Sequence, residues 1–233
     1  MIKKLCAWII SRVDNRKVIH AFEILRKIQR LNKRKIHRFI DRNIEANRLA
    51  WANHKPDNSE NDNNVFIENQ RDYEDMSFGK ATMKYSGCEI FAVFNLLQAL
   101  GESKVLNSLP DLISAFEEDG MLLSGMFGTA PKAIRDFFEV RGFSTHMTTR
   151  DSEFDELGDK SDSLILTMFN NGKNVFEQVH TINISKEKAG FVAHNVYGNG
   201  HPVGPYSSVS EVIANINGGK AKGIALIGVN AKK

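Results

Sequence analysis

The 233-residue chain contains little cysteine and no long hydrophobic run. Two cysteines, Cys6 and Cys88, cannot form a disulfide framework or supply the four ligands of a zinc site. No apolar stretch approaches the roughly 20 residues of a membrane-spanning helix, which excludes transmembrane classes. The N-terminal residues resemble a signal peptide, but their apolar stretch, residues 5–10, is too short. Arg12 follows this stretch, and no small-residue cleavage site is present. We therefore expect an intracellular, cytoplasmic protein in which one cysteine is available as a reactive thiol.

The sequence also lacks internal repeats, a metal-ligand cluster and a phosphate-binding loop. No helix follows the glycine-rich residues 198–204 at the spacing of a nucleotide-binding motif. His180, His194 and His201 have no accompanying cysteine or carboxylate cluster. Hydrophobic residues (42%) and charged residues (25%) have ordinary globular proportions, and the length suits one domain with an appendage. We expect neither a metal nor a cofactor.

Charge is unevenly distributed along the chain. Residues 1–50 carry a net charge of +10 and the remainder −7, which together give the +3 of the whole sequence. Apolar residues at three- and four-residue steps predict a basic amphipathic helix or helical hairpin here, with a cap at Asp14 and a break near Asn32. Residues 1–53 would then brace the rest of the protein, cover its cleft, or bind an anionic membrane surface or nucleic acid. We favour bracing.

The remainder divides into a polar segment and one larger domain. Residues 54–77 are acidic and rich in asparagine, which is typical of a surface linker. Residues 78–233 follow as a domain in which helices precede strands, an order that predicts the α+β class with an antiparallel sheet. The expected helices span residues 88–100, 110–118, 131–142 and 208–216, and the expected strands span 144–148, 163–169, 180–185, 191–196 and 224–229.

Cys88 is the first candidate site residue because it follows Gly87 and opens an apolar helix. The unpaired amides and the positive end of the helix dipole favour the thiolate at this position. A helix that is apolar nearly all round is buried and holds its first residue rigidly, and Gly87 leaves the approach to the sulfur open. The alternative is that Cys88 is a small buried hydrophobe, as many free cysteines are.

A cysteine nucleophile needs a base, and His180 at the start of a predicted strand is the candidate. The next strand ends at Asn195, and antiparallel pairing of the two strands would bring Asn195 close to His180. Asn195 could then accept an imidazole N–H and fix the tautomer of the ring. The alternatives are a structural strand histidine and a turn residue. His194 is expected to point outward from the opposite strand face.

The order of these motifs resembles that of the papain-like cysteine peptidases. It consists of Gly87-Cys88 with an apolar helix, Gly128-Thr129 before another helix, His180 at a strand start, Asn195-Val196-Tyr197-Gly198, and a closing strand. The resemblance covers about residues 78–230 and is nearest to the compact bacterial peptidases that process bacteriocins. It implies a papain-like fold, with a helical lobe that carries the nucleophile helix packed on an antiparallel sheet and the site between them. It also implies Cys88 as nucleophile, His180 as base and Asn195 as the residue that orients the imidazole.

Two positions depart from the family pattern. Thr82 stands where the family has a glutamine that donates to the oxyanion, so the backbone amide of Cys88 and the side chain of Thr82 become the candidate donors. Glu89 stands where glycine is common, and its carboxylate raises the thiol pKa unless it points away or binds a cationic substrate group. Gly87, Glu89 and His201 are expected to border the substrate cleft.

The sequence therefore predicts a cysteine peptidase that cleaves a peptide or isopeptide bond of a peptide or protein substrate through a thioester. A thiol acyltransferase or amidase would use the same residues. Two further alternatives are a catalytically degenerate domain that binds peptides and a basic adaptor whose function lies in residues 1–50. Under the leading hypothesis, alkylation labels Cys88 before Cys6. The sequence does not indicate whether the protein is a monomer or an oligomer.

Overall fold

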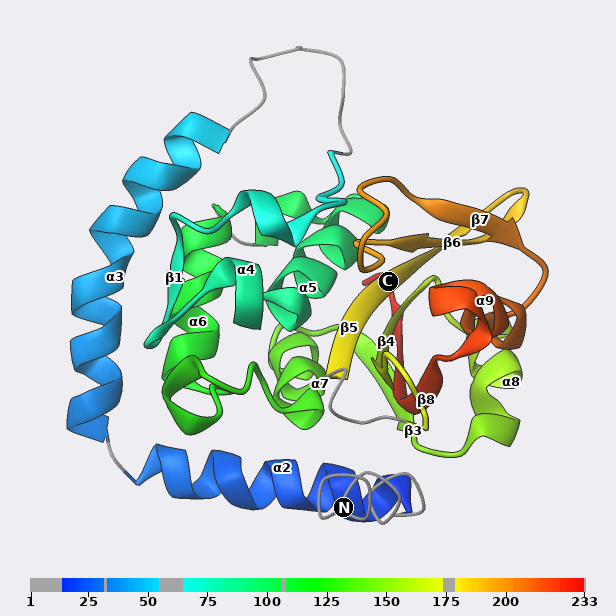
Figure 1. The fold of residues 1–233 in the computed structure, drawn as a ribbon, viewed down its shortest axis with the longest axis horizontal. Helices are drawn as coiled ribbons and strands as arrows, with labels where there is room; N and C mark the ends of the chain where they lie inside the picture. Colours follow the sequence, from blue (N-terminus) through cyan, green and yellow to red (C-terminus); the bar gives the residue numbers. More distant parts are fainter. Residues whose placement is uncertain (1–13, 32, 55–64, 106–107, 174–178, 233) are drawn as a thin grey trace.

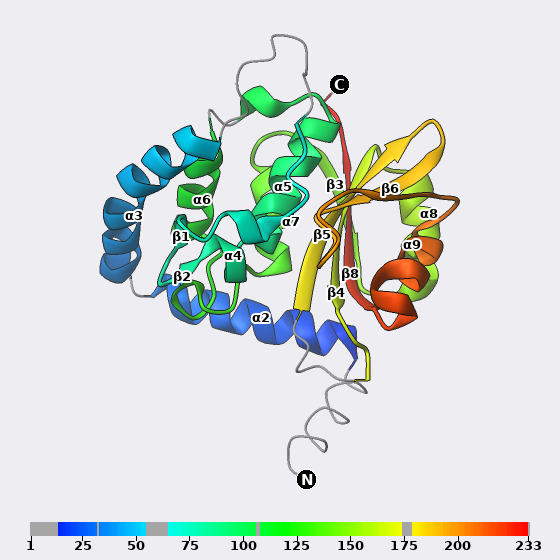
Figure 2. The ribbon, with the colours of Figure 1, turned by 45° about the horizontal axis from the view of Figure 1, so that its top comes forward.

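The computed structural model describes residues 14–31, 33–54, 65–105, 108–173 and 179–232. The described residues form a mixed α+β structure in which an antiparallel sheet lies between two groups of helices (Figures 1 and 2). The larger group comprises α2 (Asn15–Arg30), α3 (Lys33–His54), α4 (Met83–Ser86), α5 (Cys88–Ala99), α6 (Leu109–Glu118) and α7 (Pro131–Glu139). The smaller group, on the right in Figure 2, comprises α8 (Phe154–Asp159) and α9 (Val209–Asn215). This arrangement confirms the predicted class.

The main sheet contains six strands, and every neighbouring pair is antiparallel. Its strands are β3 (Ser144–Thr148), β4 (Ser163–Phe169), β5 (Val179–Glu187), β6 (Gly190–His194), β7 (Val203–Tyr206) and β8 (Lys222–Asn230), in the order β3-β8-β4-β5-β6-β7. Every residue of β4 is buried, as expected for a central strand covered by helices on both faces. A separate small sheet pairs β1 (Ser77–Phe78) with β2 (Ala81–Thr82).

The strand β5 has a free edge at its beginning, and this edge positions the site. Residues 179–185 pair with β4, whereas pairing with β6 begins only at Asn183, opposite His194. The backbone of His180 and Thr181 is therefore not covered by β6. The helix α5 packs against this part of β5 instead, which brings the first residue of α5 beside the first residues of the strand.

The basic N-terminal segment forms two helices that cover two sides of the domain. The helix α2 lies below the domain in Figure 1 and α3 on its left, so they meet at their ends rather than packing side by side. The predicted break near Asn32 is confirmed, since α2 ends at Arg30 and α3 begins at Lys33. The arrangement differs from a single long helix or a hairpin, because each helix buries its apolar face on the domain. The buried apolar side chains are Ile19 and Phe22 of α2 and Ile36, Phe39 and Ala50 of α3. The predicted cap holds, since the side chain of Asp14 accepts a hydrogen bond from the amide of Arg16.

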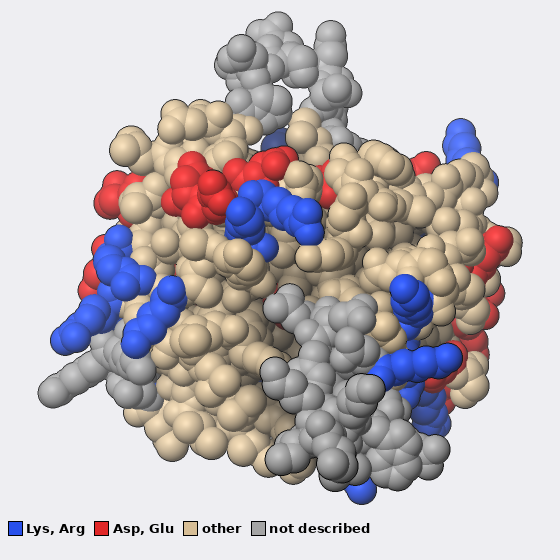
Figure 3. Space-filling model, viewed as in Figure 1, with Lys and Arg blue, Asp and Glu red and all other residues tan. Residues whose placement is uncertain are grey.

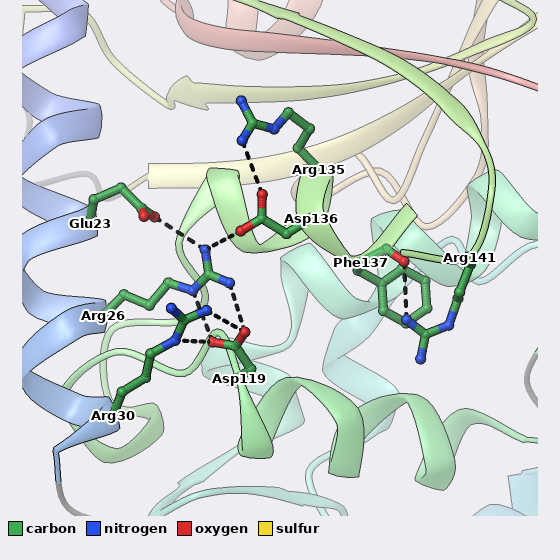
Figure 4. A network of polar contacts seen from close by, with 8 residues as sticks. All are labelled: Glu23, Arg26, Arg30, Asp119, Arg135, Asp136, Phe137 and Arg141. Carbon is green, nitrogen blue, oxygen red and sulfur yellow. Dashed lines mark hydrogen bonds and ion pairs between the residues drawn. The ribbon is translucent and has the colours of Figure 1, made fainter. Parts of the chain in front are cut away.

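Ion pairs join the same two helices to the domain. The guanidinium of Arg26, only 2% exposed, donates to both carboxylate oxygens of Asp119 (3.0 and 2.9 Å) and to Asp136 (2.8 Å) (Figure 4). Arg30 binds the same Asp119, and Arg48 of α3 reaches Asp111 of α6. Lys and Arg side chains gather over α3 on the face shown in Figure 3, with acidic side chains beside them. Part of the positive charge of the segment is thus bound by the domain.

Residues 65–76 belong to the folded domain, although the sequence favours a surface linker there. Ile67 and Met76 are buried, and Asn95 of α5 exchanges two hydrogen bonds of 2.8 Å with the backbone of Ile67. A short 3-10 helix, η1 (Gln70–Asp72), follows, and it is capped by Asn69. The few apolar residues in this acidic segment are its anchors, which explains why the composition alone is misleading.

No helix in the described part of the chain combines the length and apolar character that crossing a bilayer requires. Cys6 lies outside the described residues.

Candidate active site

Cys88 is the first residue of α5, and its side chain lies where two cavities meet. The side chain is only 6% exposed because α5 is buried nearly all round, as its sequence predicts. One cavity of about 740 Å³ is lined by Cys88 together with His180, Gln70 and other polar residues. A second, of about 590 Å³, lies on the side of α2 and is lined by Cys88, Glu89 and mostly apolar side chains. Cys88 therefore separates a polar cavity from a more apolar one.

The thiol of Cys88 is stabilised in its protonated form. Burial is the largest cause that raises its pKa well above the ordinary value, followed by the negative charge of Glu89. The thiol donates a hydrogen bond of 3.2 Å to Glu89 Oε2. Backbone amides of Thr181 and Glu89 act in the opposite direction. The expectation that the helix end favours the thiolate is wrong for the free protein, because desolvation outweighs the helix dipole.

Glu89 is itself a buried acid that faces the thiol, contrary to the expectation that it points away or binds a substrate cation. Burial raises its pKa to about 7, although the amides of Glu89 and Thr129 lower it. The carboxylate lies against Gly128, where an added Cβ would come within 2.7 Å of either oxygen. Gly128 thus provides the space that this carboxylate needs, and the carboxylate gains its ionised form only near or above neutral pH.

Replacing Glu89 by glutamine is expected to accelerate alkylation of Cys88. The variant removes a nearby negative charge and replaces the carboxylate that accepts the thiol proton by a neutral amide, which accepts more weakly and can donate to a thiolate, so the pKa of Cys88 falls and the thiolate fraction rises. The reaction with iodoacetamide, followed between pH 7 and 9 by peptide mass mapping, should be faster by about tenfold for each unit by which the pKa falls. Glu118→Gln, at an exposed position of α6, is the matched control and should leave the rate unchanged. An equal or slower rate in Glu89→Gln would contradict this assignment.

His180 lies at the start of β5, buried (3% exposed) and facing the same cavity as Cys88. Its Nε2 bonds the backbone carbonyl of Asn195 at 2.7 Å. A carbonyl oxygen only accepts hydrogen bonds, so Nε2 carries the proton and Nδ1 of the neutral ring is left as a base. Burial lowers the pKa of His180, and the bond to Asn195 opposes this. In the described chain no hydrogen bond joins His180 to Cys88, so proton transfer needs a closer approach than this state shows.

Asn195 contributes to the site through its backbone, not through its side chain as the triad hypothesis requires. Its side chain accepts from the amide of Gln70 (3.1 Å) and donates to the side-chain oxygen of Gln70 (3.2 Å). The residue has a φ of 57°, a left-handed conformation that turns its carbonyl toward the ring of His180. Strand pairing brings the two residues together, but Asn195 lies one residue beyond the end of β6.

Replacement of Asn195 by glycine is expected to preserve most of the catalytic rate of any reaction that uses His180. Glycine keeps the carbonyl and adopts the positive φ without strain, so the bond that fixes the imidazole remains. A triad that uses the side chain would instead lose about four orders of magnitude in kcat. The protein should still be less stable, by about 1–3 kcal/mol, since Gln70 loses two buried partners. Turnover and urea unfolding, measured on the same preparation, distinguish a role of the Asn195 carbonyl from a role of its side chain.

Three residues near the site were missed by the sequence analysis or assigned to the wrong place. Gln70 lines the cavity beside His180, and its side-chain amide donates to the carbonyl of Lys84 at 2.7 Å. Glu68 bonds Nδ1 of His194 at 2.6 Å and accepts from the amide of Asn195 at 3.0 Å. His194, expected to point outward, is 3% exposed and also bonds Ser185. The apolar residues beside Glu68 in the sequence are the one signal that this segment is part of the fold.

Two of the remaining candidates, Thr82 and His201, line neither cavity at Cys88, and the third, Gly87, has a structural role. Thr82 ends β2, and it is among the described lining residues of neither cavity at Cys88, so it is not placed as an oxyanion donor. His201 is exposed in the loop before β7 and lines neither cavity. Gly87 is required for packing rather than for access, because an added Cβ would lie 2.6 Å from the carbonyl of Met83 and 2.9 Å from the ring of Phe91.

No group of three or more metal-ligating side chains is found among the described residues. Comparison of the chain with protein-family models, with curated proteins and with solved structures gave no match. Function is therefore inferred from the geometry of this site.

Proposed function

We propose that the protein is a cysteine peptidase, or a related thiol hydrolase, that cleaves a peptide or isopeptide bond through a thioester on Cys88. The observation that carries this proposal is the shared cavity. It contains a cysteine at a buried helix start and a histidine whose ring is held by one carbonyl, so that its other nitrogen remains a base. These are the two groups that covalent catalysis of acyl transfer requires.

In the first half of the reaction, a substrate carbonyl lies against the sulfur and His180 Nδ1 takes the thiol proton as the C–S bond forms. Because Cys88 is protonated in the free protein, proton transfer accompanies attack rather than preceding it. The oxyanion is stabilised by the amide of Cys88, which has no acceptor within its helix. The imidazolium then gives its proton to the leaving amine, and the C–N bond breaks to leave the thioester.

In the second half, water attacks the thioester while His180 accepts one of its protons. The C–S bond breaks, the carboxylic acid departs and the sulfur regains its proton. The side-chain amide of Gln70, which faces this cavity, uses one hydrogen for Lys84 and has no second acceptor among the described residues. We assign to it a second contact with the oxyanion, in the role for which the sequence offers Thr82. A transferase would differ only by the use of an amine or alcohol in place of water.

The experiment that tests the proposal compares wild-type protein with Cys88→Ala on a synthetic peptide library, analysed by mass spectrometry. Wild type should produce new termini that Cys88→Ala does not, and acid quenching should trap an acyl adduct on the peptide that contains Cys88. Cys6→Ala is the matched control and should behave as wild type. Equal cleavage by wild type and Cys88→Ala would refute the assignment of the nucleophile.

A second candidate function is that of a peptide-binding domain without activity. The contact between the Cys88 thiol and Glu89 favours it, because this contact suppresses the thiolate. The same library experiment discriminates the two, since a binding domain would retain peptides on immobilised protein but yield no new termini and no acyl adduct.

A further inference from the structure

The two cavities lined by Cys88 differ in chemical character, because one is basic and the other is mostly apolar. Tyr85, Cys88 and Val179 line both of them, so the two cavities adjoin each other at these residues. A substrate whose carbonyl lies at Cys88 would therefore extend one way into each cavity. The properties of the two walls indicate which chemical groups each direction accepts.

The cavity that contains His180 is basic. Arg71, Lys84 and Lys220 line it, and no Asp or Glu is among its described lining residues. Lys84 is paired with Glu74 at 2.6 Å, whereas Arg71 and Lys220 have no carboxylate within ion-pair distance in the described chain. The guanidinium of Arg71 lies over the ring of Tyr197, 4.7 Å from its centre, which holds its charge at the wall. These features favour an anionic ligand.

The cavity on the side of α2 is mostly apolar, and the one carboxylate among its described lining residues is that of Glu89, which bonds the thiol of Cys88. Val18 and Phe22 of α2 form one wall, and Phe169 at the end of β4 forms another. Met126 and Phe127, on the loop before α7, complete the rim although they are 69% and 49% exposed. Large apolar side chains gathered in a concave surface beside a nucleophile are typical of a subsite for an apolar group.

The position of His180 gives the direction of binding. The imidazole lines the basic cavity only, and the leaving amine must receive its proton from this ring. The leaving group therefore occupies the basic cavity, and the acyl group occupies the apolar one. Resting on the proposed function, we propose that the substrate class is a peptide with a large apolar residue on the acyl side of the scissile bond and acidic residues on the leaving side.

The test measures binding without catalysis, using Cys88→Ala and fluorescein-labelled peptides of equal length. One peptide places Leu-Phe before Asp-Glu, a second places Leu-Phe before Lys-Arg, and a third places Gly-Ser before Asp-Glu. Fluorescence anisotropy should give an affinity for the first that exceeds that for either of the others by about tenfold, equivalent to about 1.4 kcal/mol. Equal affinities for the three peptides would overturn the proposal.

Variants locate the two preferences. In the Cys88→Ala background, Lys220→Glu should remove the preference for the acidic peptide, whereas the same change at Lys188, in the exposed turn between β5 and β6, should not. Met126→Asp should remove the preference for Leu-Phe, and the control Leu49→Asp, at an exposed position of α3, should not. Equal effects of a variant and its control would count against the corresponding cavity.

Cleavage by the wild-type protein separates this inference from the proposed function. If Cys88→Ala shows the binding preference but wild type produces no new termini, the hydrolase proposal fails and the assignment of the two cavities is supported. If wild type cleaves all three peptides at equal rates through Cys88, the hydrolase proposal is supported and the substrate assignment is overturned.

Discussion

His180→Gln is expected to lower kcat for peptide cleavage by about three orders of magnitude or more. The glutamine side chain can still donate a hydrogen bond to the carbonyl of Asn195, so the buried hydrogen bond that His180 makes there is replaced by an equivalent one. An amide cannot accept the thiol proton or return it to the leaving amine, and both halves of the reaction need that transfer. Kinetics on the best peptide from the library, with KM and kcat resolved, measure the effect.

Two controls accompany this variant. One replaces a different histidine, and the other measures alkylation of Cys88 in place of peptide cleavage. His201→Gln changes an exposed histidine that lines neither cavity at Cys88, and it should cleave at the wild-type rate. Alkylation of Cys88 in His180→Gln should still occur at high pH, because the thiol ionises there without a base. A kcat within tenfold of wild type would exclude His180 as the base.

The fold was predictable where local patterns and burial agree. The bounds of β3 and β4 match the prediction to the residue. The strand β4 is a nearly continuous apolar run, whereas β3 has Met147 as its only large apolar residue and follows the turn at Gly142. The paths of α2 and α3 were not predictable, since an amphipathic pattern shows which face is buried but not against what. The short helix α8 and the edge strand β7 were missed because they have few apolar residues and are defined by tertiary contacts.

The candidate site was predictable only in part for a similar reason. The sequence indicates that Cys88 starts a buried helix and that His180 starts a strand, and the structure places both on one cavity. It could not show that Glu89 turns toward the thiol, because that depends on the space left by Gly128. Nor could it show that the carbonyl of Asn195, rather than its amide, meets the imidazole, because this follows from a single positive φ at the end of a strand.

Arg26→Met is expected to lower the free energy of unfolding by about 3 kcal/mol. Arg26 is almost fully buried and makes three charge-assisted hydrogen bonds, two to Asp119 and one to Asp136 (Figure 4). Methionine fills much of the space of the aliphatic stem but leaves the two carboxylates facing each other without the cation between them. Arg30 and Arg135 still contact these carboxylates, which limits the loss.

Arg48→Met is the matched control, since Arg48 is 53% exposed and pairs with Glu45 and Asp111 at the surface. Its loss should cost no more than about 1 kcal/mol, because solvent screens exposed ion pairs. Urea unfolding of both variants at pH 7 measures the difference. Burial raises the pKa of Asp119, but the hydrogen bonds from Arg30 and Arg26 outweigh it and hold the pKa below its usual range. The free energy lost in Arg26→Met should therefore begin to shrink below about pH 4, where the unfolded chain takes up this proton, and should shrink further as the pH falls through the lowered pKa of Asp119 in the folded protein. Equal losses in the two variants would show that α2 is held by its apolar face alone, and the buried arginine would then contribute nothing beyond packing.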